Sequence, residues 1–187
     1  LGRGGALSFN EHFWAQWLDD STFFTAGNNN LETGAGSALD IDSLTTATVA
    51  LMNQTDPDGN PLGLTMSDLI LLVPTNLAHT AKQLVNSTEI RGVTGAFGTA
   101  NPHAGNFEVV VSSYLSSMAG GSATAWYVLA RPSVLPAIQA GFLNGNRRPT
   151  IESAEADFNN LGIRMRGFWD FGARKWEYRA GVKSNGA

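Results

Sequence analysis

Histidine and carboxylate side chains are the first candidates for chemistry in this chain, because they bind metal ions and transfer protons near neutral pH. The three histidines, His12, His79 and His103, lie far apart in the sequence. A metal site would need the fold to bring them together with supporting carboxylates. We expect instead that they are scattered over the surface or in interfaces, and we predict no metal site.

Two groups of carboxylates could act as acid–base pairs if one member were buried or if two members shared a proton. Asp19 and Asp20 form the first group, and Glu152, Glu155 and Asp157 form the second. Nothing in the neighbouring sequence indicates that either group is buried. We interpret the first group as charge at the end of a helix and the second as part of a solvated loop.

Turn-forming and glycine-rich segments could hold a calcium ion, a phosphate or a dinucleotide. Residues 56–60, DPDGN, resemble the start of a calcium loop, but Gly59 is fourth instead of sixth and Ser67 replaces the twelfth-position Glu. The glycines at 34, 36, 92, 95 and 98 fit neither the dinucleotide nor the P-loop spacing. No GxSxG motif is present. The sequence therefore predicts no catalytic residue and no cofactor.

The composition favours a protein that meets other proteins. Charged residues make up 15% of the 187 residues, whereas soluble domains average about 25%. The net charge of -4 gives no global positive field that could hold nucleic acid. The absence of cysteine excludes disulfides and thiolate metal sites. The longest apolar run, residues 69–73, is far shorter than the roughly 20 residues of a membrane-spanning helix.

Hydrophobic periodicity and capping residues predict three helices, over about residues 10–18, 43–54 and 76–86. We expect Asp42 to cap the second helix. The unbroken apolar run at 69–73, ended by Pro74, is typical of a central strand covered on both faces.

The second half of the chain is predicted to be mostly strand. Strand signals lie at 107–114, 124–130, 150–153 and 162–171. Residues 87–106 lack periodicity and predict a long loop, residues 131–142 a short helical or irregular segment, and residues 25–36 a loop with several positive φ angles. This order of elements indicates an α+β fold without regular βαβ alternation.

Five segments, taken in order, carry a resemblance to a known family. They are FFTAGNNNLETGAGSALDIDSLTTATVALMNQTDPDGNPLG, LILLVPTNLAHTAKQLVNSTE, VVVSSYL, AWYVLARP and DFGARKWEYRAGVKSNGA, and they span about residues 23–187. The chain resembles the C-terminal portion of a tailed-phage major capsid (head) protein with the Hong Kong 97-type fold. Within that family it is most similar to Mu-like head proteins and to those made fused to a prohead protease. The signal is the serial order of the segments.

The resemblance implies a domain organisation. Residues 1–39 would hold the end of the spine helix and a loop of the peripheral domain, residues 40–150 the axial domain, and residues 151–187 strands that return to the peripheral domain. The N-terminal arm and the extended loop of the family are absent. Because the chain starts with Leu, we expect it to be a truncated or processed product.

The resemblance also implies a function. The chain would be a structural subunit of a bacteriophage or prophage virion, without catalysis, and the full-length protein would form pentamers and hexamers. It would assemble in the bacterial host cytoplasm into an icosahedral shell that encloses DNA as non-specific cargo, with no role for a membrane. One alternative is an encapsulin-like nanocompartment shell protein. Another is a small ligand-binding or enzymatic domain with its site in residues 87–106, near His79 or His103.

In the light of the resemblance, strand alternation near the C-terminus separates candidate core residues from candidate interface residues. In residues 163–171 and 176–182, one face of each strand is expected to pack inside the subunit and the other to meet neighbouring subunits. An ordinary solvated face is the alternative to the interface. The candidate core residues are Leu71, Val73, Trp169, Phe171, Trp176 and Tyr178. The candidate subunit-interface residues are Arg164, Arg166, Lys175, Glu177 and Arg179.

Overall fold

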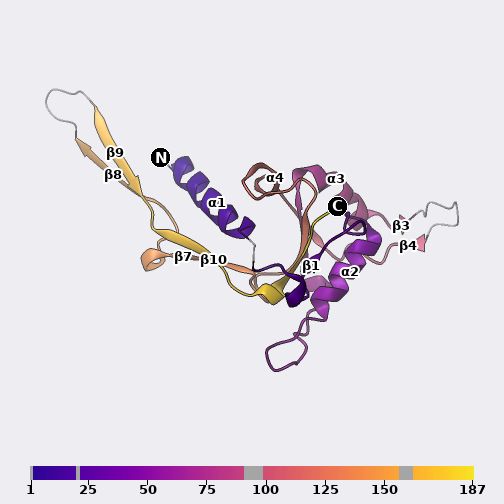
Figure 1. The fold of residues 1–187 in the computed structure, drawn as a ribbon. Helices are drawn as coiled ribbons and strands as arrows, with labels where there is room; N and C mark the ends of the chain where they lie inside the picture. The colour runs from indigo at the N-terminus through magenta and orange to yellow at the C-terminus, as the bar shows by residue number, and fades with distance from the viewer. Residues whose placement is uncertain (1, 20–21, 91–98, 156–161) are drawn as a thin grey trace.

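The computed structural model describes residues 2–19, 22–90, 99–155 and 162–187 and has an α+β fold (Figure 1). Its helices and strands alternate irregularly along the chain, as the sequence predicts. The four helices of the described residues are α1 (Gly2–Leu18), α2 (Ile41–Met52), α3 (Ala78–Asn86) and α4 (Tyr114–Ser117). The strands of the same residues are β1 (Leu31–Glu32), β2 (Leu69–Pro74), β3 (Glu89–Ile90), β4 (Thr99–Ala100), β5 (Glu108–Ser112), β6 (Trp126–Ala130), β7 (Ile138–Phe142), β8 (Thr150–Glu155), β9 (Ile163–Phe168), β10 (Phe171–Lys175) and β11 (Gly181–Ser184).

A five-stranded mixed sheet with the order β1-β11-β6-β2-β5 organises one end of the molecule. The predicted central strand at 69–73 is confirmed: β2 pairs with β6 in antiparallel and with β5 in parallel orientation. Leu71 faces Val128 of β6 and Val109 of β5 in this register. We call this sheet, together with α2, α3 and α4, the lobe.

One face of the lobe's sheet is covered by α2 and α3. Leu69, Leu71 and Val73 point to this side and are fully buried against apolar residues of both helices. Helix α2 begins two residues earlier than predicted, because Asp40 and not Asp42 caps it. The Asp40 carboxylate accepts a hydrogen bond from the Ser43 amide at 2.8 Å, and the Ser43 hydroxyl accepts one from the Asp40 amide at 3.0 Å. This reciprocal arrangement satisfies two otherwise unpaired amides of the first turn.

The other face of the sheet is covered only in part. Trp17 and Leu18 at the end of α1 pack there with Leu72 of β2 and Tyr127 of β6. Ile70 of β2 stays half-buried on the same face. Since side chains alternate along a strand, β2 presents one closely packed side and one partly open side.

Strands β7 to β10 form an elongated extension, which we call the arm (residues 138–175). β7 pairs with β10 in antiparallel register, and β8 pairs with β9 as an antiparallel hairpin beyond them. Helix α1 lies along β10 and connects the arm to the lobe (Figure 1).

Besides the cap of α2, four sequence predictions differ from the structure. The first helix begins at Gly2 instead of near residue 10, because Gly2, Gly4 and Gly5 are poor helix formers that hide its first turns. Residues 138–142, predicted irregular, form β7, because pairing with a strand about 30 residues later decides their conformation. The predicted loop 87–106 contains β3 and β4, while its residues 91–98 lie outside the described part.

The fourth difference concerns the predicted strands near the C-terminus. The strand predicted at 162–171 breaks at Trp169 and Asp170 into β9 and β10. The strand predicted at 176–182 is interrupted by a 3-10 turn, Tyr178–Ala180, before β11 begins. Strand β11 then joins the lobe's sheet between β1 and β6.

Candidate interaction surface

The histidines do not meet. His12 on α1 and His79 on α3 are exposed, whereas His103 is buried in the lobe. Its Nε2 lies 2.8 Å from the hydroxyl oxygen of Thr45, and burial lowers the pKa of its ring, with an opposing effect from a backbone hydrogen bond to Ile41. The described residues contain no group of three or more His, Cys, Asp or Glu that could hold a metal ion.

The carboxylates likewise form no acid–base pair among the described residues. Glu152 lies in β8, as the strand predicted at 150–153 implies, and not in the solvated loop expected for its carboxylate group. Its carboxylate is 2.5 Å from the Arg166 guanidinium. The side chains of Asp20, Glu155 and Asp157 lie outside the described part. In the 56–60 turn, hydrogen bonds from Asn60 hold the pKa of the Asp56 carboxyl below its usual value, so the donors of the turn itself satisfy this carboxylate.

Four of the five candidate interface residues contact their own subunit, and three of these four lie at the end of β10 or between β10 and β11. The Lys175 ammonium donates a hydrogen bond to the Asp19 carbonyl. Arg179 pairs with Glu177 at 3.0 Å and lies over the Tyr178 ring at 4.4 Å. These three residues therefore lie where arm and lobe meet.

The remaining two, Arg164 and Arg166, lie on β9 at the exposed end of the arm, separate from the other three. Arg166 makes the ion pair with Glu152 described above. The five residues therefore do not form one continuous charged face.

The candidate core residues divide into three groups. Leu71 and Val73 are fully buried in the lobe. Trp169, Phe171 and Tyr178 are half-buried. Trp176 is 67% exposed and does not belong to the core. Because the chain leaves strand conformation after Lys175, the alternation that predicted a buried Trp176 does not apply there.

An aromatic cluster joins α1 to the arm. Phe9 of α1 lies 5.2 Å from Phe171, 5.4 Å from Trp169 and 5.6 Å from Phe142, measured between ring centroids. The Trp169 indole also donates a hydrogen bond to the Asn146 carbonyl at 2.8 Å. Stacked and edge contacts of this kind stabilise aromatic pairs beyond the area they bury. Trp169 and Phe171, predicted as core residues, thus pack in this small cluster and not in the main core.

The β8–β9 hairpin has an apolar face and a charged face. Its register places Ile151, Ile163 and Met165 on one side, with the positions of Ser153 and Glu155 opposite Met165 and Ile163. Arg164 and Arg166 lie on the other side with Glu152 and Phe168, as alternation predicts for β9. The apolar face does not pack inside the subunit, however: Ile151 is 50%, Met165 60% and Ile163 70% exposed. A two-stranded ribbon has no second layer to cover it, so both faces meet solvent.

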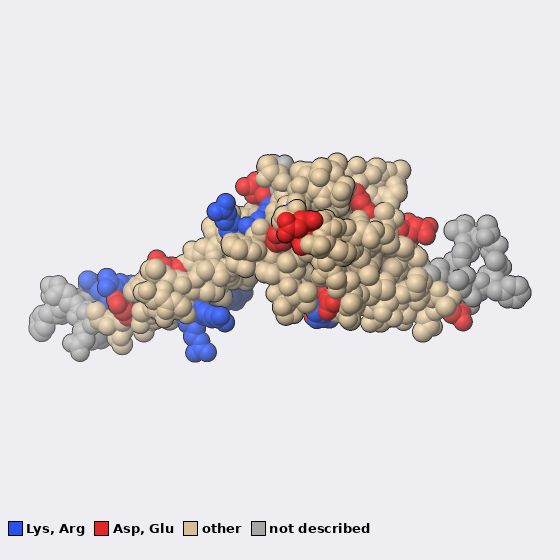
Figure 2. Space-filling view, turned by 90° about the horizontal axis from the view of Figure 1, so that it is seen from below, with Lys and Arg blue, Asp and Glu red and all other residues tan. Residues whose placement is uncertain are grey.

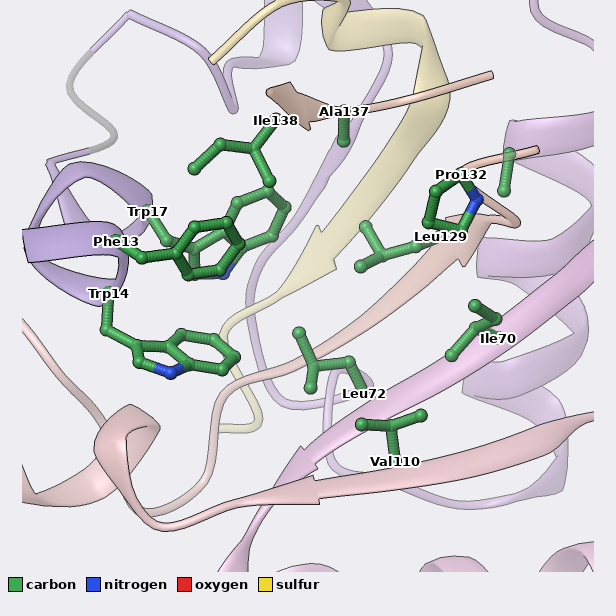
Figure 3. Close-up of a pocket in the computed structure, with 11 residues that line it drawn as sticks. Phe13, Trp14, Trp17, Ile70, Leu72, Val110, Leu129, Pro132, Ala137 and Ile138 are labelled. Carbon is green, nitrogen blue, oxygen red and sulfur yellow. The ribbon is translucent and has the colours of Figure 1, made fainter. Parts of the chain in front are cut away.

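A second apolar surface lies between α1 and the open side of the lobe's sheet. Figure 3 shows Phe13, Trp14 and Trp17 of α1 on one side of this groove, and Leu72, Val110 and the other sheet residues opposite. The groove encloses about 200 Å³, and its lining is almost entirely apolar. The sequence could not reveal it, because its two walls come from segments more than 50 residues apart.

Charge is distributed unevenly between the two ends of the molecule. Residues 138–175 carry six Lys or Arg and four Asp or Glu, whereas residues 22–137 and 176–187 together carry five and nine. Figure 2 shows basic side chains along the arm and acidic side chains over the lobe. No helix of the described residues is long and apolar enough to cross a lipid bilayer.

A family model described as phage capsid protein matches residues 1–184. No curated protein and no solved structure matches the chain significantly.

Proposed function

This chain belongs to the phage capsid protein family, and we propose that it is the major shell-forming subunit of an icosahedral phage head with the Hong Kong 97-type fold. Family membership makes it a structural component of a virion. It indicates a structural role and not a catalytic one. The fold type, the shell geometry and the DNA cargo are parts of the proposal.

The observation that carries the proposal is the uncovered apolar face of the β8–β9 hairpin. A subunit that worked alone would leave Ile163 and Met165 in water, at a cost of roughly 25 cal/mol for each Å² of apolar surface. Contact with neighbouring copies removes this surface from water. Repetition of such contacts over many subunits stabilises a shell even when each contact is weak.

We assign residues 40–150 to the axial domain and residues 1–39 and 151–187 to the peripheral domain. In favour of this assignment, α2, α3, β2, β5 and β6 all lie within 40–150 and form most of the lobe. Helix α1 packs against β10 as a spine helix would pack on the peripheral strands. The two units interleave, since β11 completes the lobe's sheet and β7 belongs to the arm.

The proposed partners are other copies of the chain, arranged as pentamers and hexamers in the full-length protein, with assembly in the host cytoplasm. The packaged DNA would be non-specific cargo. A net charge of -4 is consistent with this role, because no global positive field holds nucleic acid tightly to the subunit.

Electron microscopy of the product expressed together with its upstream coding region tests this function. We expect closed shells with five-fold and six-fold capsomers, and nuclease-resistant DNA inside particles recovered from infected or induced cells. Shells that hold an enzyme and no DNA would instead support the encapsulin-like alternative. A product that stays monomeric under all assembly conditions would overturn the shell function.

A further inference from the structure

Two apolar surfaces of this chain have no cover among the described residues. One is the groove between α1 and the sheet, and the other is the apolar face of the β8–β9 hairpin. In Figure 1 the hairpin extends away from the five-stranded sheet, so it cannot reach the groove of its own chain. Any contact between the two surfaces must join two copies.

The size and the apolar lining of the groove suit the insertion of an apolar side chain. Its volume of about 200 Å³ exceeds the roughly 150 Å³ of an engineered apolar cavity that holds benzene. Val110 on its sheet wall is 37% exposed, so an entering group can touch it without moving the backbone. Its almost wholly apolar lining does not select polar ligands.

The outer end of the hairpin carries apolar side chains that could enter such a groove. Ile163 and Met165 are two residues apart on one face of β9, whereas Ile151 lies at the base, beside Gly4 and Gly5 of α1. Met165 is unbranched and flexible, so its side chain adapts to an irregular apolar pocket. Anchors of this kind, inserted into a pocket, supply most of the energy of protein interfaces.

We propose that Met165 and Ile163 of one copy insert into the groove of a neighbouring copy. This inference rests on the proposed self-association and names the surfaces that carry one of its contacts. The contact is heterologous, because a convex hairpin meets a concave groove, and such contacts repeat around a ring until it closes.

Charge supports a second copy as the occupant. Residues 138–175 carry two more basic than acidic residues, and residues 22–137 and 176–187 together carry four more acidic than basic ones. The basic excess comes from Arg147, Arg148, Arg174 and Lys175, which lie outside the β8–β9 hairpin. This difference between the two ends steers the arm of one copy towards the lobe of another, and burial of the apolar side chains then holds the hairpin in the groove.

Disulfide trapping between two variants tests the contact directly, because the natural chain contains no cysteine. Met165→Cys protein is mixed under mild oxidation with Val110→Cys protein that carries a mass tag, so that a crosslink between unlike chains is identified by its size. We expect this pair to give at least tenfold more mixed dimer than either of two control pairs. In the first control Arg164→Cys, on the opposite face of the hairpin, replaces Met165→Cys. In the second, Val49→Cys, exposed on α2, replaces Val110→Cys.

Equal yields from the test and control pairs would overturn the proposal, as would a product made only of Met165→Cys homodimers, which would mean that hairpins meet each other. If a non-protein ligand or another segment occupies the groove instead, the test pair should give as little mixed dimer as the control pairs, and the proposal would likewise be wrong.

Assembly of the product expressed with its upstream region separates failure of this contact from failure of the proposed function. Val110→Glu should reduce the yield of shells at least tenfold, while the matched Val110→Thr stays within twofold of the natural chain. Thermal melts establish that both variants fold. If the natural chain assembles and Val110→Glu assembles equally well, this contact is wrong and the shell function stands. If the crosslink forms but no variant ever yields shells, the contact stands and the shell function fails.

Discussion

The lobe and the arm bury their apolar residues in different ways. In the lobe, α2 and α3 closely cover one side of β2, where Leu69, Leu71 and Val73 have no exposed surface. In the arm, every residue of β9 is exposed, including Ile163 and Met165. The continuous apolar run of β2 thus becomes part of a closed core, whereas the apolar residues of the alternating strand β9 stay uncovered.

This difference separates what stabilises the monomer from what joins monomers. Isolated two-stranded hairpins are at best marginally stable in water, so β8 and β9 gain most from contact with a neighbour. The face of the lobe's sheet under α2 and α3 needs no neighbour, because these helices supply the second layer. Substitutions in this core should therefore change the free energy of unfolding, and substitutions on the hairpin or in the groove should change assembly.

The largest effect is expected in the lobe, for Trp126→Ala. The Trp126 ring is fully buried and its indole donates a hydrogen bond to the Ser37 carbonyl at 2.9 Å. Removal of a buried aromatic ring leaves a cavity and costs about 3–5 kcal/mol of unfolding free energy. Denaturant titration measures this loss, with Trp176→Ala, at a 67% exposed site, as the control that should change stability by less than about 0.5 kcal/mol. Equal losses for the two variants would contradict the assignment of the core.

A smaller loss is expected for Trp169→Ala, at the junction of arm and α1. Its ring contacts Phe9, Phe142 and Phe171 but is only half-buried, so we expect a loss of about 2 kcal/mol and not that of a fully buried ring. The neighbouring Phe168→Ala, at a 48% exposed position, is the matched control and should lose less than about 1 kcal/mol. Denaturant melts of both variants measure the difference. A loss at Trp169 as small as at Phe168 would mean that the aromatic cluster does not hold α1 to the arm.

His103 should make the stability of the lobe depend on pH. Burial lowers the pKa of His103 in the folded state from the usual 6.5, so the unfolded chain binds a proton that the folded chain does not. By linkage, the stabilising effect of the neutral ring is complete above pH 6.5 and decreases as the pH falls below this value. Chemical denaturation between pH 7.5 and 5 should show this decrease, and His103→Gln should flatten it. A natural chain that gains stability over this interval would contradict the buried, neutral histidine.

The smallest effect is expected in the arm, for the ion pair between Glu152 and Arg166. Both side chains are well exposed, at 45% and 78%, and water screens their attraction. A double-mutant cycle with Glu152→Gln and Arg166→Gln should give a coupling energy of no more than about 0.5 kcal/mol in the monomer. A coupling above about 2 kcal/mol would show that this end of the arm is dry and packed within the single subunit.

The sequence predicted the lobe better than the arm. The apolar run at 69–73 identified β2, because a strand covered on both faces needs no polar alternation. The Asn and Gly content of residues 25–36 predicted positive φ angles, and Asn29 and Gly34 adopt φ of 52° and 94°. In the arm, β7 escaped prediction because its five residues acquire strand structure only by pairing with β10.

The candidate interface residues show what strand alternation cannot predict. Alternation correctly separated Ile163 and Met165 from Arg164 and Arg166, but it does not tell whether a second layer exists to cover the apolar side. Lys175, Glu177 and Arg179 also contact their own subunit, and their role in an interface stays a prediction. The groove at Val110 has no signal in the sequence, since its walls come from distant segments.

By itself, the sequence determined the α+β class, the central strand β2, two of the helices to within two residues, and the two sides of the hairpin. These features depend on backbone preferences and on alternation over a few neighbouring residues. Only the tertiary structure decided that α1 and the sheet leave a groove open, that Trp176 is exposed while Trp126 is not, and that the hairpin's apolar side has no cover. Burial depends on which distant segments meet, and local patterns do not carry that information.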